Sequence, residues 1–144
     1  MKTLLMICMI YFSQELPGNV KKSFENMYPE ISEHSFQKNG DKYEIDFMND
    51  SEFTIAVFSS KGKLILTKVL DNTDLPSSVY KELDEYKKDI QIHRAFIVED
   101  AEGQEYYEVH CEGNESEWIF NFSIDGELIN HKEFPLEEDE VIDY

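Results

Sequence analysis

The chain of 144 residues has few of the residues that build disulfide scaffolds, metal sites and phosphate-binding loops. Its two cysteines, Cys8 and Cys111, could form one bridge, but they supply neither a disulfide framework nor metal-ligand spacing. We expect Cys111 to be a small buried residue at the end of a strand. Six glycines, most of them needed in turns, leave none for a glycine-rich phosphate loop.

The sequence also lacks the patterns that carry catalysis. No nucleophile stands beside a base and no metal triad is present, so we predict that the protein is not an enzyme and has no cofactor. The acidic loops 71–74 and 99–103 do not reproduce a calcium-binding loop. The four histidines are His34, His93, His110 and His131. No two of them have the spacing of zinc ligands, so no zinc site is expected either.

Basic residues are scarce, with 13 against 31 acidic residues and a formal net charge of −18. Such a surface repels phosphate backbones and anionic headgroups, which disfavours nucleic acid and membrane partners. A cationic protein partner is favoured, although the same charge can serve solubility alone. Hydrophobic residues make up 41% and aromatic residues 13%, so the chain should fold. We expect the acidic tail, 135–144, to fray.

The apolar run from Thr3 to Phe12 has ten residues, about half of what a membrane span requires. It follows Lys2 and has the length of a signal-peptide core, so we predict an apolar leader over 1–14 and a periplasmic or secreted protein. Tyr11 is bulky where a small residue should precede cleavage after Ser13. A retained N-terminal strand or helix, and a cytoplasmic location, therefore stay open as alternatives.

An internal repeat is the strongest positive feature of the sequence. The stretch FSSKGKLI at 58–65 returns as FSIDGELI at 122–129, which is 64 positions later. Collinear matches of this kind predict a tandem duplication, with a first repeat over 15–70 and a second over 71–134. A unit of about 60 residues buries too little surface alone, so the two should share a sheet or a core.

Each repeat has the pattern of one helix followed by a four-stranded antiparallel meander, which makes the fold class α+β. Pro17 suits the first turn of a helix over 17–28, and Pro76 opens the second helix. Alternation of apolar and polar residues over 42–48 and the hairpin signal Asn39-Gly40 indicate strands. The expected strands are 33–38, 42–48, 53–58 and 64–69, then 92–98, 106–111, 117–123 and 127–133.

These ordered features resemble the PepSY-like proteins that share the fold of beta-lactamase inhibitory protein. The features are Leu16-Pro17-x-x-Val20, Tyr43-Glu44-Ile45 and Phe58-x-x-x-Gly62, with Leu75-Pro76-x-x-Val79, Tyr107-Glu108-Val109 and Phe122-x-x-Asp125-Gly126 in the second repeat. The resemblance spans residues 15 to about 134. It implies aligned sheets with the helices on one side, an open and often concave face on the other, an extracytoplasmic setting, and binding or inhibition of another protein.

The parity of each strand assigns residues to the two faces of the sheet. Phe53, Ile55, Val57 and Ile119 should lie on the open face, where an apolar patch marks an interaction surface unless the leader, the tail or a second copy covers it. An acidic and aromatic surface on the same face suits a basic or polar protein partner, although a merely solvated face has the same composition. The predicted partner-binding residues are Glu44, Asp46, Phe53, Ile55, Tyr106, Glu108 and His110.

The favoured interpretation is an exported, non-enzymatic module that holds a protein or peptide on its open sheet face, with inhibition as one form of that role. The alternative is a structural or assembly component of the bacterial cell envelope that acts as a homodimer. A dimer that hides Phe53 and Ile55 would favour the second interpretation.

Overall fold

The computed structural model describes residues 15–86 and 89–136, which form two helices and one antiparallel sheet. This confirms the α+β class. The sheet has eight strands in the order β1 to β8, each paired with its neighbours in sequence. The elements are α1 (Gly18–Met27), β1 (His34–Asn39), β2 (Lys42–Asn49), β3 (Glu52–Ser59), β4 (Leu64–Leu70), α2 (Ser77–Tyr86), β5 (Gln91–Asp100), β6 (Glu105–Glu112), β7 (Ser116–Ser123) and β8 (Leu128–Pro135).

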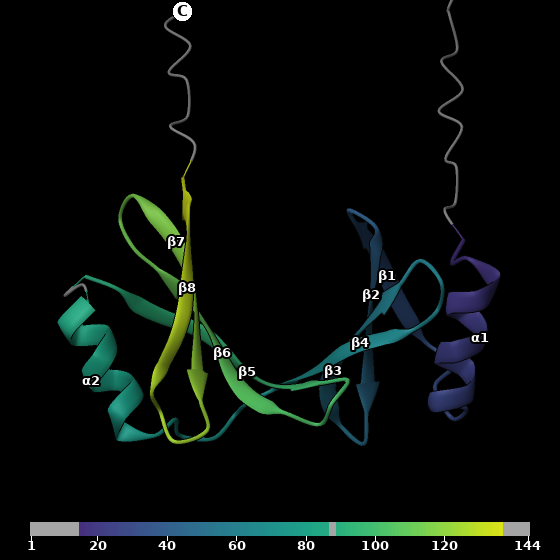
Figure 1. Cartoon of the computed structure of the whole chain (residues 1–144), viewed down its shortest axis with the longest axis horizontal. Helices are drawn as coiled ribbons and strands as arrows, with labels where there is room; N and C mark the ends of the chain where they lie inside the picture. The colour runs from purple at the N-terminus through teal and green to yellow at the C-terminus, as the bar shows by residue number, and fades with distance from the viewer. Residues whose placement is uncertain (1–14, 87–88, 137–144) are drawn as a thin grey trace, which may run out of the picture.

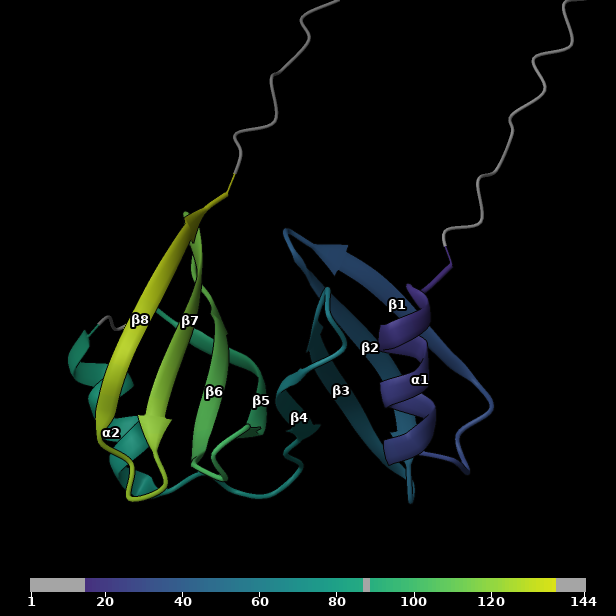
Figure 2. The same cartoon turned by 45° about the vertical axis from the view of Figure 1, so that its right-hand side comes forward.

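The two meanders are joined into one sheet by the pairing of β4 with β5, which runs from Leu66 opposite Asp100 to Leu70 opposite Phe96. The sheet bends across this junction. Figure 1 shows its two arms rising on either side of a hollow, with α1 and α2 on the outer flanks, and Figure 2 shows the same arrangement turned by 45°. The outer face of the sheet is therefore convex and carries the helices, while the inner face is concave.

The core lies between each helix and the convex face. In the first half, Val20 and Phe24 of α1 pack against residues of β2 and β3, including Ile45 and Phe58. In the second half, α2 packs on β5, β6 and β7, and the cluster contains Leu75, Val79, Leu83, Ala95, Val109, Cys111, Trp118, Phe120 and Phe122. The helical spacing of four residues between the buried positions of each helix sets this single apolar stripe.

The turns follow from local chemistry. Gly40 lies in the turn between β1 and β2 with φ 64°, a left-handed conformation that glycine adopts without steric cost. Asp50 and Ser51 both have positive φ, 48° and 69°, which is the pattern of the type I′ turn that matches strand twist. Pro17 is the N-cap of α1 rather than its first helical residue, a shift of one position from the expected start.

Some expectations fall at the edges of the described chain. The leader, 1–14, and residues 137–144 of the tail lie outside the described residues. The predicted start of the tail at residue 135 falls inside β8, which ends at Pro135. Within residues 15–86 and 89–136, no helix is both long and apolar enough to cross a bilayer.

Candidate functional site

The concave face contains a groove of about 660 Å³ to which all eight strands contribute residues. It is open to solvent along the hollow between the two arms of the sheet. Its lining combines apolar residues with polar and charged ones. The lining consists of Gln37, Asn39, Asp41, Lys42, Glu44, Asp46, Phe53, Ile55, Val57, Ile65, Leu66, Lys68, Arg94, Phe96, Glu108, His110, Ile119, Asn121, Asn130, Lys132 and Phe134.

The groove brings together most of the residues that strand parity had placed on the open face. Six of the seven predicted partner-binding residues line it: Glu44, Asp46, Phe53, Ile55, Glu108 and His110. Tyr106 does not belong to the lining. It pairs with Val98 and Ser123 on neighbouring strands, is half-buried, and stands two residues from Glu108 on β6. The binding role of all seven residues stays a prediction.

The apolar patch lies on the concave face, as strand parity predicted, and is only partly exposed. Val57 is only 4% exposed, and Phe53, Ile55 and Ile119 are half-buried. The physical reason is curvature: on a concave face, neighbouring side chains converge and cover one another, whereas parity arguments assume a flat sheet. Phe96 on the same face is likewise 1% exposed. The patch is therefore part of the floor of a groove.

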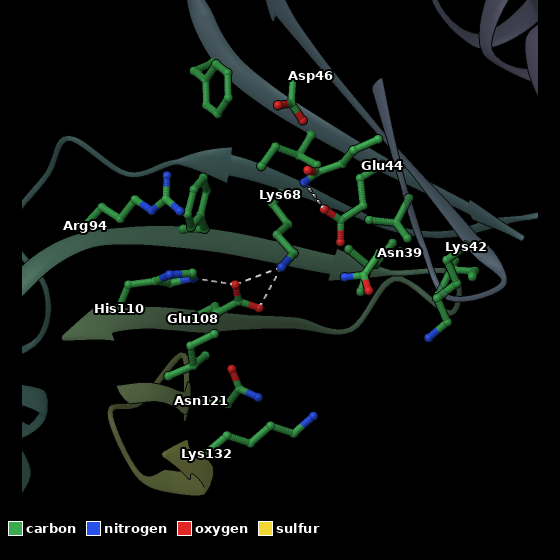
Figure 3. Close-up of a pocket in the computed structure, with 18 of the residues that line it drawn as sticks. Asn39, Lys42, Glu44, Asp46, Lys68, Arg94, Glu108, His110, Asn121 and Lys132 are labelled. Carbon is green, nitrogen blue, oxygen red and sulfur yellow. Dashed lines mark hydrogen bonds and ion pairs between the residues drawn. The ribbon is translucent and has the colours of Figure 1, made fainter. Parts of the chain in front are cut away.

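A buried ionic network crosses this floor. The Glu108 side chain lies on β6, is 9% exposed, and receives hydrogen bonds from Lys68 Nζ on β4 at 2.8 and 3.0 Å. His110 Nε2 lies 2.7 Å from Glu108 Oε1. Figure 3 shows the carboxylate held between these two groups. Because Lys68 reaches across β5 to Glu108, the network ties the first half of the sheet to the second.

The network fixes the ionisation of Glu108. Burial by itself would raise the pKa of this carboxyl, but the hydrogen bonds from His110 and Lys68, together with the charges of both groups, outweigh burial and hold the pKa below its usual value. An ionised carboxylate engaged by two donors holds charge in place and is poorly suited to moving a proton. The network thus links β4 and β6 across the floor of the groove, and links of this kind help to preorganise a binding surface.

Sequence reasoning missed Lys68, the cation of this network. It is the one charged residue of β4, whose sequence is Leu-Ile-Leu-Thr-Lys-Val-Leu. A single lysine in an otherwise apolar central strand is rarely buried without a partner, so its position was a usable signal. Its partner could not be found from the sequence, because Glu108 is 40 residues away.

Asp46 on β2 is a carboxylate of the groove whose ionised form is disfavoured. Burial raises its pKa, and the nearby Glu44 carboxylate raises it further, while Arg94 acts in the opposite direction. Its Oδ1 atom is buried and has no hydrogen-bond donor among the described residues. Arg94, the sole arginine in the sequence, lies with its guanidinium 5.3 Å from the ring centroid of Phe96, in cation–π range.

Among residues 15–86 and 89–136, no three potential ligands gather into a metal site. Cys111 lies in the core on the convex side, and burial raises the pKa of its thiol to about 12, so it is a poor nucleophile at neutral pH. The arrangement of shape, charge and apolar floor is suited to contact with another molecule.

Comparison with known proteins identifies the fold. No protein-family model and no curated protein matches the sequence. Solved structures from Bacteroides do match in shape. A BLIP-like protein of Bacteroides fragilis has a TM-score of 0.64 at 19% identity and covers 88% of this chain and 92% of its own. A DUF2874 family protein of Bacteroides uniformis has a TM-score of 0.67 at 17% identity, with coverage of 81% and 88%.

A third structure, of a proposed periplasmic protein of Bacteroides eggerthii, has a TM-score of 0.68 at 16% identity and covers 83% of this chain and 90% of its own. These three similarities span nearly the whole described chain. The fold of this protein is therefore BLIP-like, which is the fold that the ordered sequence features implied.

Proposed function

We propose that this chain is a non-enzymatic binding module that holds a protein or peptide in the groove on its concave face. The observation that carries the proposal is the groove itself, about 660 Å³ in volume, lined from all eight strands. A lining that combines half-buried apolar residues with convergent charged groups is typical of binding surfaces. The BLIP-like fold of the neighbour from Bacteroides fragilis supports the same role, with inhibition of a partner as one form of it.

The ionic network in the floor of the groove is a second support for this role. A partner that binds a preorganised surface does not have to order it, so less of the interaction free energy is lost on association. The Lys68–Glu108 pair joins strands β4 and β6 across the junction between the two halves. A change in either residue would alter the shape of the groove as well as its charge.

Export to the periplasm or the cell exterior is part of the proposal. It is supported by the apolar leader over 1–14 and by the resemblance to a structure that is itself proposed to be periplasmic. The alternative function remains a structural or assembly component of the cell envelope that acts as a homodimer. In such a dimer the second copy would cover Phe53 and Ile55, which line the groove and are partly exposed in the single chain.

We further propose that the two halves arose by tandem duplication and that the chain is PepSY-like. Corresponding turns support this. Gly62 and Gly126 have φ of 81° and 86°, and each donates its amide hydrogen to the carbonyl of the serine three residues earlier, Ser59 or Ser123, at 2.9 Å. Each half also has a register shift in the strand before that turn. Two unrelated segments would have little reason to share both details.

Site-specific photo-crosslinking tests the binding role. The full-length chain would carry p-benzoylphenylalanine at Ile119 in the groove or, as the matched control, at Tyr80, which is 43% exposed on α2. After irradiation in the native cell, we expect a discrete crosslinked protein with the groove probe alone. Equal products from both positions, or a crosslink only to a second copy of this chain, would refute the proposal.

A further inference from the structure

The charges of the groove are divided between its two walls. On the first wall, β2 and its turn carry Asp41, Glu44 and Asp46, with Lys42 as the base among them. Three carboxylates against one ammonium leave a charge of −2 on this wall. Lys68 also belongs to the first half, but its charge is compensated by Glu108 in the floor.

The second wall has the opposite sign. Arg94 on β5 and Lys132 on β8 line the groove, and the one carboxylate contributed by β5–β8, Glu108, is already paired with Lys68. This wall therefore carries a charge of +2. Within the described part of the chain, neither Arg94 nor Lys132 forms an ion pair. Figure 3 shows the carboxylates of β2 on one side of the groove and Lys132 on the other.

The two walls influence each other without touching. Arg94 lies close enough to Asp46 to affect the ionisation of its carboxyl, yet no ion pair joins the two. Asp46 Oδ1 stays buried without a donor. Among the described residues, the Asp46 carboxylate has no ion-pair partner, and the Arg94 guanidinium contacts only the Phe96 ring, so the two can face two different groups of a guest.

Resting on the proposed function, we propose that the groove is bipolar: it docks a partner segment that sets a basic side chain against Asp46 and Glu44 and an acidic side chain against Arg94 and Lys132. Charge complementarity selects this occupant. A segment with only basic side chains would meet the repulsion of the second wall. The net charge of −18 attracts cationic partners at a distance, but the groove then discriminates among them.

A second copy of the chain fits less well, although a two-fold axis would pair each wall with its opposite. Two concave faces laid together enclose space instead of interdigitating, and two chains of charge −18 repel each other. The charge pattern therefore favours a different protein whose contacting segment is convex.

The experiment uses capped synthetic peptides titrated into the isotope-labelled full chain and followed by amide chemical shifts. One set joins an arginine and an aspartate through glycine spacers of increasing length. Matched sets replace the arginine by glutamine, the aspartate by asparagine, or both. At the best spacing we expect the doubly charged peptide to bind about tenfold more tightly than either singly charged one, with shifts on both β2 and β8.

Variants assign each charge to its wall. Asp46→Asn should weaken binding only of peptides that contain arginine, and Lys132→Gln only of those that contain aspartate. Glu82→Gln and Lys81→Gln are the matched controls, because they make the same charge changes on exposed residues of α2. These controls should leave every affinity unchanged. The amide spectrum reports in the same measurement that each variant is folded.

Several results would overturn the inference. They are equal affinity for doubly and singly charged peptides, binding that ignores both groove variants, and an absence of shifts on the concave face with every peptide. Dimerisation that is lost in Asp46→Asn would identify a second copy as the occupant and would also overturn it. A groove-specific photo-crosslink together with charge-indifferent peptides would leave the binding role standing and remove only the bipolar specificity.

Discussion

Replacing Glu108 by glutamine is the sharpest test of the ionic floor, because the amide keeps the shape of the side chain and removes its charge. Glu108 accepts two hydrogen bonds from Lys68 and contacts His110 at 2.7 Å. Breaking a fully buried ion pair costs about 3–5 kcal/mol. Lys68 is 19% exposed and regains part of its hydration, so we expect a loss of about 2 kcal/mol in the free energy of unfolding at pH 7.

The pH dependence of this loss has a definite sign. The pKa of Glu108 in the folded protein lies below its ordinary value of 4.5, so its contribution to stability is fully present above that value. The contribution disappears as the pH falls through the lower, folded pKa. Because glutamine mimics the protonated acid, the difference between Glu108→Gln and the native chain should shrink over the same pH range.

Urea unfolding followed by tryptophan fluorescence measures this difference, with Trp118 as the probe in the second-half core. A loss of about 2 kcal/mol corresponds to a drop of about 8 °C in Tm for a domain of this size. Glu85→Gln is the matched control, since Glu85 pairs with Lys81 at 4.0 Å on an exposed helix face. That surface pair should contribute less than about 0.5 kcal/mol.

A double variant separates loss of the pair from loss of packing. Replacing Lys68 by methionine together with Glu108→Gln removes both charges, and stability should recover relative to Glu108→Gln alone because no uncompensated buried charge remains. Native-like stability of Glu108→Gln at pH 7 would refute the reasoning. So would a difference that stays constant down to a pH at which Glu108 is protonated in the folded chain.

Two further predictions concern single positions. Gly126→Ala should lower the free energy of unfolding by about 1–2 kcal/mol more than Gly103→Ala does. Both glycines have positive φ, but only at Gly126 would the added carbon overlap the Ser78 hydroxyl. Equal urea midpoints for the two variants would contradict this prediction. Asp46→Asn should raise the urea midpoint at pH 7 and not at a pH below 3.8. Burial and the neighbouring carboxylate raise the pKa of Asp46, so the folded protein disfavours its ionised form, which asparagine removes. A lower urea midpoint of the variant at pH 7 would contradict this prediction.

The elements of the fold were predictable because they depend on local chemistry. The period of apolar residues changes from helical to alternating after residue 31, and hairpin signals such as Asn39-Gly40 stand between the strands. Predicted strand bounds differ from the observed ones by only a few residues. The parity of β2 and β6 also placed Glu44, Asp46, Glu108 and His110 on one face, since alternation along a strand is a property of the backbone alone.

The groove residues that were missed depend on contacts between strands. Arg94 was not predicted as a groove residue, because an exposed arginine on a strand indicates a binding site only when the residues opposite it are known. Phe96 belonged to an expected strand, but its burial on the concave face required the bend of the sheet. The partial burial of Phe53 and Ile55 depends on the same bend.

The sequence by itself determined the order of two helices and eight strands, the turns, the alternation of faces and the net charge, because each arises from neighbouring residues or from composition. Only the tertiary structure decided that β4 pairs with β5, that the resulting sheet curves into a groove, and that Lys68 meets Glu108 across it. Those features depend on residues far apart in the chain and on the accumulated twist and bend of paired strands, which no local pattern specifies.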